Sequence, residues 1–373
     1  MIHVSSVARY SVPLISALRT ELHPPIAHLA LYLLCVVCLN GCSETKPLQT
    51  HELLQGATMG TTYTIRYQPE SGGPLKQALH HKIEDELLRL NQQMSTYLKD
   101  SEITRFNASS STDWFSVSSE TAVLVDLSLR LSMASEGAFD IIVGPLVNLW
   151  GFRPGKRSNT IPTDEELDIA RAWVGYQQLS VRLDPPGLKK AKPELQIDLS
   201  AIAKGHGSDR VGAVIEANGI SNYFVEIGGE IVARGNRADG QPWRVGIEAP
   251  LDFQQSLKTT LSLSDAAIAT SGDYRNFFEF EGHRFSHTID PNTGRPVTHQ
   301  LASASAVADN GALADGIATC MMAMGPERGL ELAESKSWAV LLILRQGNRF
   351  PSTCSTRFSE LFPEVSKQLS VAK

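Results

Sequence analysis

A short apolar run in the last part of the chain carries residue types that bind a hard metal cation. Asp315 and Thr319 stand four positions apart within the segment Ala314–Thr319. Residues i and i+4 share one face of a helix, so their oxygen atoms point into one small volume. Two such oxygens suit Mg²⁺, which takes waters and phosphate oxygens as further ligands. The structural alternative is an aspartate near a helix N-terminus and a threonine bonded back to its own helix.

A turn that follows His287 holds a second set of reactive side chains. The stretch Ile289–Pro296 contains Asp290, two prolines and a glycine, which are residue types that favour a tight turn. An imidazole beside such a turn can act as a general base or as a structural hydrogen-bond donor, and a single histidine is more often structural. His287 and Asp290 are therefore candidates whose roles depend on what lies opposite them.

The segment Gln196–Gly207 is typical of a strand that turns into a helix. It places Asp198, Lys204 and the free N–H groups of a helix N-terminus near one another. Helix N-termini bind phosphate because these N–H groups lack partners and the helix dipole is positive there. The spacing is not that of a P-loop. A capped helix with a solvated Lys204 is the structural alternative.

Helical and strand patterns alternate along the chain, and they must position these residues. A helix is predicted over 79–94, with Ile83, Leu87, Leu90 and Met94 facing inward, and another over 119–135, with Val123, Leu124, Leu127 and Leu131 inward. A third is predicted to be capped by Ser200 and to end near Gly219, and two more cover 310–323 and 326–335. Strands are predicted over 57–67, 195–199, 223–227, 231–233, 243–247, 257–263, 277–280, 283–288, 303–308 and 339–344, with a two-residue turn at Gly228-Gly229. This succession predicts an α+β fold, with antiparallel-type hairpins and packed helices, rather than a doubly wound parallel sheet. We expect one large mixed domain over 56–345, with 346–373 as its C-terminal tail.

The N-terminal residues predict an exported protein. The apolar run Leu29–Leu39 is shorter than the roughly 20 residues that cross a bilayer, but it suits the core of a signal peptide. It ends in Leu39-Asn40-Gly41-Cys42, which resembles the lipobox of bacterial lipoproteins, although Asn40 stands where Ala or Ser is usual. We expect a signal peptide over 1–41, a lipidated Cys42 and a tether over 42–55. An uncleaved membrane anchor is the alternative. Ser43 after the cysteine favours the outer membrane, on the periplasmic side of the envelope, if the organism has one.

Charge and cysteine content exclude other classes of protein. The formal net charge of −6 offers no basic footprint for nucleic acid. Beyond Cys42 the only cysteines are Cys320 and Cys354. Two cysteines do not make a disulfide scaffold, and no Cys/His spacing suggests zinc. Cys320 stands in an apolar helical segment and is predicted to be a small core residue.

Several motifs follow one another between about Gly56 and Gly325: Met59-Gly60-Thr61, Met94-Ser95-Thr96-Tyr97, Gly137-Ala138-Phe139-Asp140, Asp198–Gly205, Val225–Gly229, Thr270–Arg275, Ser286–Pro296 and Ala314–Thr319. In this order the chain resembles the ApbE-type FAD:protein FMN transferases, many of which are exported lipoproteins. The resemblance implies an ApbE-like, T-fold-related domain. It also implies Mg²⁺-dependent transfer of the FMN moiety of FAD to a Ser or Thr hydroxyl of a target protein, with release of AMP.

The resemblance also implies roles for individual residues. The positions that contact FAD in relatives correspond here to Met59, Tyr97, Ala138, Phe139, Asp140, Asp198, Lys204 and Ile289. The metal is expected between the backbone oxygen of Ala201 and the side chains of Asp315 and Thr319.

Transfer to a hydroxyl needs a base, because a hydroxyl is a poor nucleophile at neutral pH. His287 is the first candidate, since it adjoins the Ile289-Asp290 turn, and Asp198 and Asp290 are the reserves. Water in place of the acceptor would make the same site an FAD pyrophosphatase that yields FMN and AMP. A non-catalytic flavin-binding lipoprotein is a further alternative.

The acceptor is predicted to be another protein. The family recognises the pattern Asp-x-x-Ser/Thr-Gly-Ala-Ser/Thr, and this chain does not contain it. The family's targets are commonly subunits of ion-pumping redox complexes or other exported flavoproteins, so we expect an acceptor flavoprotein of that kind.

Overall fold

Eight antiparallel strands form the central sheet in the part of the chain that the structure, a computed structural model, describes: residues 51–152, 161–251, 256–274, 277–280 and 283–371. The strands lie in the order β1 (Glu52–Thr58), β2 (Thr61–Tyr67), β6 (Tyr223–Ile227), β7 (Glu230–Arg234), β10 (Ala266–Gly272), β15 (Leu301–Ala308), β16 (Ala339–Leu344) and β17 (Ser352–Cys354). Each neighbouring pair is antiparallel. The predicted α+β class with antiparallel hairpins is confirmed.

Smaller sheets complete the strand content. They are β3 (Phe115–Ser116) with β5 (Pro186–Lys190) and β4 (Leu179–Leu183), β8 (Trp243–Glu248) with β9 (Leu257–Leu263), β11 (Phe277–Phe280) with β12 (His283–Ser286), and β13 (Ile289–Asp290) with β14 (Arg295–Pro296). The predicted signal peptide, the lipidation site Cys42 and the tether up to residue 50 lie outside the described residues. Within the described ranges, no helix combines the length and hydrophobicity needed to cross a bilayer.

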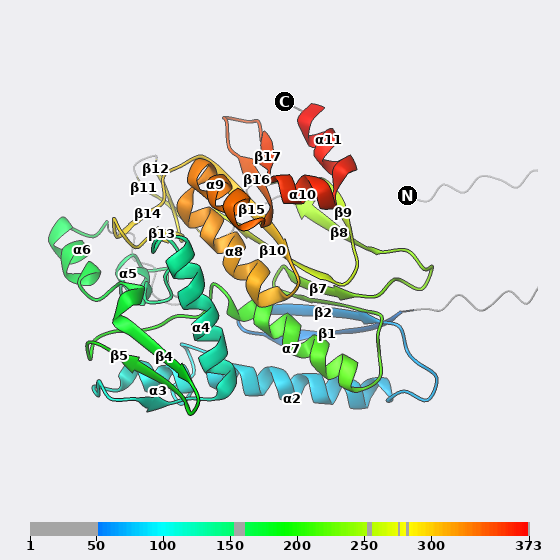
Figure 1. Cartoon of the computed structure of the whole chain (residues 1–373), viewed down its shortest axis with the longest axis horizontal. Coiled ribbons are helices and arrows are strands. Elements are labelled where there is room, and N and C mark those ends of the chain that lie inside the picture. Colours follow the sequence, from blue (N-terminus) through cyan, green and yellow to red (C-terminus); the bar gives the residue numbers. More distant parts are fainter. Residues whose placement is uncertain (1–50, 153–160, 252–255, 275–276, 281–282, 372–373) are drawn as a thin grey trace, which may run out of the picture. The chain divides into compact units, whose positions relative to one another are not determined.

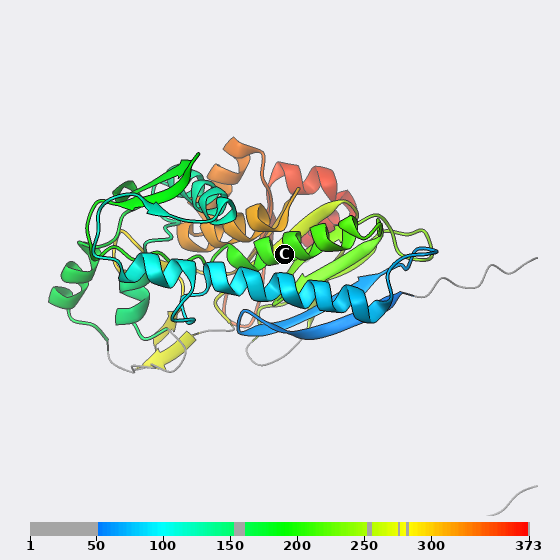
Figure 2. The same ribbon diagram turned by 90° about the horizontal axis from the view of Figure 1, so that it is seen from below.

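Two helices, α7 (Ala203–Ala217) and α8 (Gly311–Met324), lie side by side on one face of the central sheet (Figure 1). Helix α2 (Lys76–Met94) packs along α7, as the view from below shows (Figure 2). The other helices are α3 (Glu102–Ala108), α4 (Ser119–Ala134), α5 (Gly144–Leu149), α6 (Asp164–Arg171), α9 (Pro326–Lys336), α10 (Thr356–Leu361) and α11 (Pro363–Val371), with a 3-10 turn at Tyr176–Gln178.

The central strands are buried on both faces, because successive side chains point to opposite sides of a sheet. In β16, Val340 and Leu342 join the core beneath α7 and α8. Leu341 and Ile343 join a second core, together with residues of the β8–β9 hairpin and of α10. Cys320 is fully buried in the first core, as predicted. A strand covered on both faces reads as a continuous apolar run, which explains why β16 was predicted with its observed bounds.

Helices α7 and α8 approach each other closely at two glycines. A Cβ added to Gly205 would lie 2.1 Å from the carbonyl oxygen of Gly311, so neither position has room for a side chain. The first turn of α8 is capped twice. Asn310 accepts a hydrogen bond from the N–H of Leu313, and the half-buried Asp209 of α7 accepts from the N–H groups of Gly311 (2.6 Å) and Ala312 (2.9 Å). These contacts fix the start of α7 against the first turns of α8.

Two predicted strands need correction. The strand predicted over 57–67 is a hairpin, because Met59 (φ 49°) and Gly60 (φ 75°) form a two-residue turn between β1 and β2. Strand β1 begins at Glu52, inside the segment assigned to the tether. The segment 195–199 forms no strand and belongs to no sheet of the described residues.

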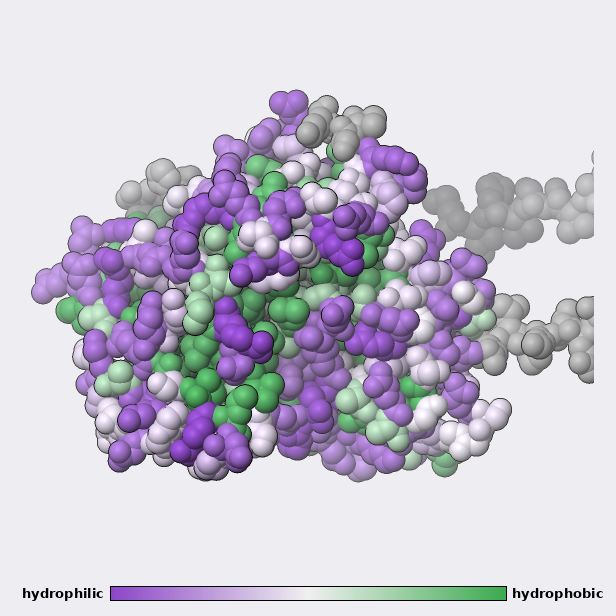
Figure 3. All heavy atoms as spheres, viewed as in Figure 1, coloured by the Kyte–Doolittle hydropathy of each residue, from purple (hydrophilic) through white to green (hydrophobic). Residues whose placement is uncertain are grey.

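Two predictions on helices also need correction. Ser200 does not cap α7, whose N-cap is Ile202; the Ser200 N–H donates instead to Asp198 Oδ1, 2.9 Å away, and this local turn delays the helix. In α4, Leu124 and Leu131 are buried as predicted, but Val123 is 54% exposed. Apolar side chains are gathered over α4 and between α4 and α8 on this face (Figure 3). The stripe predicted for α2 is confirmed, since Ile83, Leu87, Leu90 and Met94 are all buried.

Candidate active site

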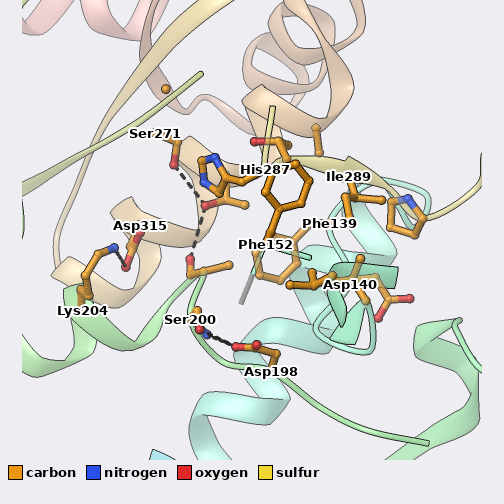
Figure 4. A pocket seen from close by; sticks show the side chains of 18 of the residues that line it. Phe139, Asp140, Phe152, Asp198, Ser200, Lys204, Ser271, His287, Ile289 and Asp315 are labelled. Atoms are coloured by element: carbon orange, nitrogen blue, oxygen red, sulfur yellow. Dashed lines mark hydrogen bonds and ion pairs between the residues drawn. The ribbon is translucent and has the colours of Figure 1, made fainter. Parts of the chain in front are cut away.

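A cavity of about 370 Å³ opens where α7, α8, β10, the β13–β14 hairpin and the chain after α4 meet. One side of it is apolar, and Phe139, Phe152 and Ile289 lie together there (Figure 4). Lys204 and Asp315 lie on the opposite side, and His287 lies between the two groups (Figure 4). The cavity therefore has an apolar wall, which suits a flat apolar group, and a charged side formed by Lys204 and Asp315.

The structure brings most of the predicted site residues together. Among the positions predicted to contact FAD, those that line the cavity are Tyr97, Ala138, Phe139, Asp140, Asp198, Lys204 and Ile289. The predicted metal ligands Ala201, Asp315 and Thr319 also line it, as does the predicted base His287.

Two predicted residues are placed elsewhere. Met59 is not among the lining residues; its side chain packs on α7, where a Cβ added to Gly207 would lie 3.1 Å from Met59 Cε. Asp290 is not among them either, and its Oδ1 accepts a hydrogen bond from the N–H of Asn292 (2.9 Å) within its own turn.

The three predicted metal ligands converge where α7 begins. Thr319 Oγ1 lies 3.4 Å from the carbonyl oxygen of Ala201 and 3.2 Å from Ser271 Oγ. Asp315 is 2% exposed, and its Oδ2 accepts a hydrogen bond from the N–H of Gly205 at 3.0 Å. The described residues contain no group of three His, Cys, Asp or Glu side chains able to hold a metal alone. The donor set is a carboxylate, a hydroxyl and a carbonyl oxygen, which fits a hard cation that completes its shell with phosphate oxygens and water.

A buried charge cluster adjoins these ligands. Lys204 Nζ lies 3.0 Å from Glu230 Oε1 and 4.0 Å from Asp315 Oδ2. Burial and the nearby Asp315 raise the pKa of Glu230 to about 8, although Lys204 opposes the shift. Burial also raises the pKa of Asp315, against the effect of Lys204. Two buried acids thus face one ammonium group, and a bound divalent cation would favour their ionised forms.

Glu230 was missed in the sequence. It is 4% exposed, and its Oε2 has no hydrogen-bond partner in the described part of the chain. Its sequence signal is weak, because it is a single acid directly after Gly228-Gly229. Its burial depends on β7 pairing with β10 while α7 covers that face, which local patterns do not reveal.

The segment that carries Asp198 is held without a sheet partner. The side chain of Asn107 accepts from the N–H of Ile197 (2.8 Å) and donates to its carbonyl oxygen (2.9 Å). Lys190 is 1% exposed, and its Nζ donates to the carbonyl oxygen of Pro193 at 2.8 Å. The N–H of Asp198 also donates to the carbonyl oxygen of Ile141 (2.7 Å), so these hydrogen bonds hold the segment that brings Asp198 to the cavity.

The apolar wall has a small core of its own. Its buried members are Leu146, Trp150, Leu167, Ala170, Val174 and Ile289. Val143, Val147 and Phe152 pack against this core and also line the cavity. Beside them, Asp140 is buried, and burial raises its pKa to about 6. Tyr97 lines the cavity while remaining 59% exposed, so it lies at the rim.

Comparison with known proteins identifies relatives of this arrangement. The model of the ApbE family matches residues 59–342. The FAD:protein FMN transferase of Vibrio cholerae is 46% identical over 332 residues, which cover 89% of this chain and 97% of that protein. The solved structure of the flavin transferase ApbE from Vibrio cholerae has a TM-score of 0.78 at 44% identity, over 84% of this chain and 99% of that one. The apo flavinyl transferase ApbE of Pseudomonas stutzeri has a TM-score of 0.77 at 42% identity, over 84% and 97%.

Proposed function

The chain belongs to the ApbE family, and from that premise we propose that this FAD:protein FMN transferase moves the FMN moiety of FAD to a Ser or Thr hydroxyl with Mg²⁺ and releases AMP. The observation that carries the proposal is the union, in one cavity, of an apolar wall and a carboxylate–hydroxyl–carbonyl group. FAD has two parts that match these two sides: a flat, largely apolar ring system and a charged diphosphate.

The two sides of the cavity divide the binding of FAD between them. Phe139, Phe152 and Ile289 offer apolar surface to the isoalloxazine ring. Lys204, in the first turn of α7, faces the diphosphate, where its ammonium group and the positive end of the helix dipole attract negative charge. Asp315, Thr319 and the carbonyl oxygen of Ala201 would hold Mg²⁺, which neutralises the diphosphate and the charge that develops on the leaving phosphate.

The transfer itself is an in-line displacement at phosphorus. The acceptor oxygen forms a bond to the FMN-side phosphorus, while the bond from that phosphorus to the bridging oxygen breaks and AMP leaves. The proton of the acceptor hydroxyl passes to His287, which lines the cavity between the ring side and the metal side. The acceptor is an exported flavoprotein, such as a redox-complex subunit, that carries the family's acceptor motif.

Removing the metal separates transfer from simple binding. With FAD and an acceptor domain, the protein is expected to release AMP in Mg²⁺, to stop in EDTA and to resume when Mg²⁺ is restored, because a cation must neutralise the charge that develops on the departing AMP. Chromatography of the nucleotides measures this. AMP without labelled acceptor would indicate the pyrophosphatase, and AMP release that continues in EDTA would exclude the metal's role.

We also propose that Cys42 anchors the protein to the periplasmic side of the cell envelope. One support is the apolar run that precedes the lipobox-like Leu39–Cys42. The other is the resemblance to a family of which many members are exported lipoproteins. More than one acyl chain is needed for stable anchoring, and a lipoprotein cysteine supplies it. Cys42→Ser is expected to abolish palmitate labelling and to move the protein out of the membrane fraction. Labelling that persists in this variant would contradict lipidation at Cys42.

A further inference from the structure

The segment that carries His287 and Ile289 into the cavity has little structure of its own. The β13–β14 ladder consists of two residue pairs, Ile289 with Pro296 and Asp290 with Arg295. An isolated hairpin of this length is not stable in water. The position of the segment therefore depends on contacts from outside the hairpin.

Trp150, which follows α5, contacts the segment at both ends. Its indole Nε1 donates a hydrogen bond to the carbonyl oxygen of Gly294, 2.7 Å away, after the cavity residues. Its ring stacks on Phe285, before them, with a centroid distance of 5.7 Å and an interplanar angle of 26°. Trp150 is 1% exposed and is not among the residues that line the cavity. One buried side chain thus spans both ends of the segment.

The far end of the hairpin lies close to side chains of α5 and α6. Gly294 has φ 72°, and a Cβ added there would lie 3.0 Å from Arg171 Cγ and 3.2 Å from Leu146 Cδ2. The turn is therefore packed against α5 and α6, and the Trp150 hydrogen bond fixes its carbonyl oxygen in that position. Loss of the bond would leave the carbonyl oxygen of Gly294 without this donor, at a cost in free energy that favours movement of the turn.

We propose that Trp150 is a positioning residue, which clamps Phe285 and Gly294 and thereby fixes Ile289 and His287 at the cavity. It acts through these residues and does not touch the substrate. The part that concerns FAD binding rests on the cavity being the FAD site, and the part that concerns His287 rests on the proposed function.

The chain offers a matched control for removing the indole donor. Trp243 is 3% exposed, its Nε1 donates to the carbonyl oxygen of Arg234 at 3.0 Å, and its ring lies 5.7 Å from that of Phe224. It belongs to the second core, and it does not line the cavity. Trp150→Phe and Trp243→Phe therefore remove the same kind of hydrogen bond while each keeps an aromatic ring.

The first measurement is the dissociation constant of FAD. It is obtained from the change in flavin fluorescence on titration with the full chain in detergent. Trp150→Phe is expected to raise the dissociation constant by up to about tenfold, because at most the free energy of one buried hydrogen bond is transmitted to the cavity, whereas Trp243→Phe changes it less than about twofold. The two variants should have similar melting temperatures. Equal affinities in both variants, or equal losses in both, would overturn the proposal. If Trp150→Phe does not fold, Phe285→Leu loosens the same clamp at its other end, and unchanged affinity there has the same meaning.

A double-mutant cycle tests whether Trp150 acts through His287. If it does, Trp150→Phe lowers the transfer rate in the wild-type chain but not further in His287→Ala, because neighbouring contributions are not additive. Independent, additive effects would remove His287 from the proposal. Failure of the proposed function is recognised separately, since the wild-type chain would then bind FAD without transferring FMN while the affinity comparison remains valid.

Discussion

Asp315→Asn is expected to lower FMN transfer by about a thousandfold or more, because several kcal/mol of charge stabilisation at the diphosphate depend on the metal. The amide can still accept the hydrogen bond that Gly205 donates to Asp315. Burial raises the pKa of Asp315, so its ionised form is disfavoured in the folded protein. Replacing it with a neutral amide should therefore leave the melting temperature equal or higher. The prediction combines lost transfer with retained stability.

The measurements are the transfer rate, the midpoint of a Mg²⁺ titration and thermal unfolding. Asp309→Ala is a suitable control, because Asp309 is exposed just before α8. It should behave as the wild-type chain in all three. Normal turnover of FAD by Asp315→Asn at ordinary Mg²⁺ concentration would contradict the assignment of Asp315 as a metal ligand. Lost turnover together with a collapsed melting temperature would show that Asp315 is structural.

His287→Ala is expected to slow transfer about a hundredfold or more, the usual contribution of general base catalysis. FAD affinity should change little, because the apolar wall and the metal ligands are intact. The deficit should shrink as the pH rises, since hydroxide can then remove the proton that the imidazole no longer accepts. The transfer rate is measured against pH, with FAD affinity measured in parallel.

His81→Ala provides the comparison, since His81 is exposed on α2, a helix that contributes no residue to the cavity lining. It should leave both the rate and its pH dependence unchanged. Transfer at the wild-type rate by His287→Ala would remove His287 from the role of base and return attention to Asp198, the reserve candidate that lines the cavity.

How much of the fold could be predicted depended on how local the signal was. Strands β6, β9 and β16 were predicted with their observed bounds, because apolar and β-branched residues mark them out. Strand β10, at the centre of the sheet, was missed: its sequence Ala-Ala-Ile-Ala-Thr-Ser-Gly is made mostly of small residues that fit beneath α8 but carry little strand preference. Short helices such as α5 were missed because one turn and a half shows no clear periodicity.

The residues of the site also differ in how far the sequence alone could identify them. Asp315 and Thr319 could be paired from the sequence because the helix itself places i and i+4 on one face. Glu230 could not be found in this way, since its carboxylate meets Lys204 only through the packing of β7 against α7. Met59 was placed at the ligand only by its motif. Its side chain packs on α7 at Gly207, and its contact with FAD stays a prediction.

The most direct test of FMN transfer is the intact mass of an acceptor domain after incubation with the full chain, FAD and Mg²⁺. The domain carries the motif Asp-x-x-Ser/Thr-Gly-Ala-Ser/Thr, and the matched control has alanine at the acceptor hydroxyl. We expect the acceptor to gain the mass of one FMN, with release of one AMP, and the control to gain nothing. Free FMN and AMP with an unlabelled acceptor, or no product at all, would contradict transfer and leave a hydrolase or a flavin-binding lipoprotein.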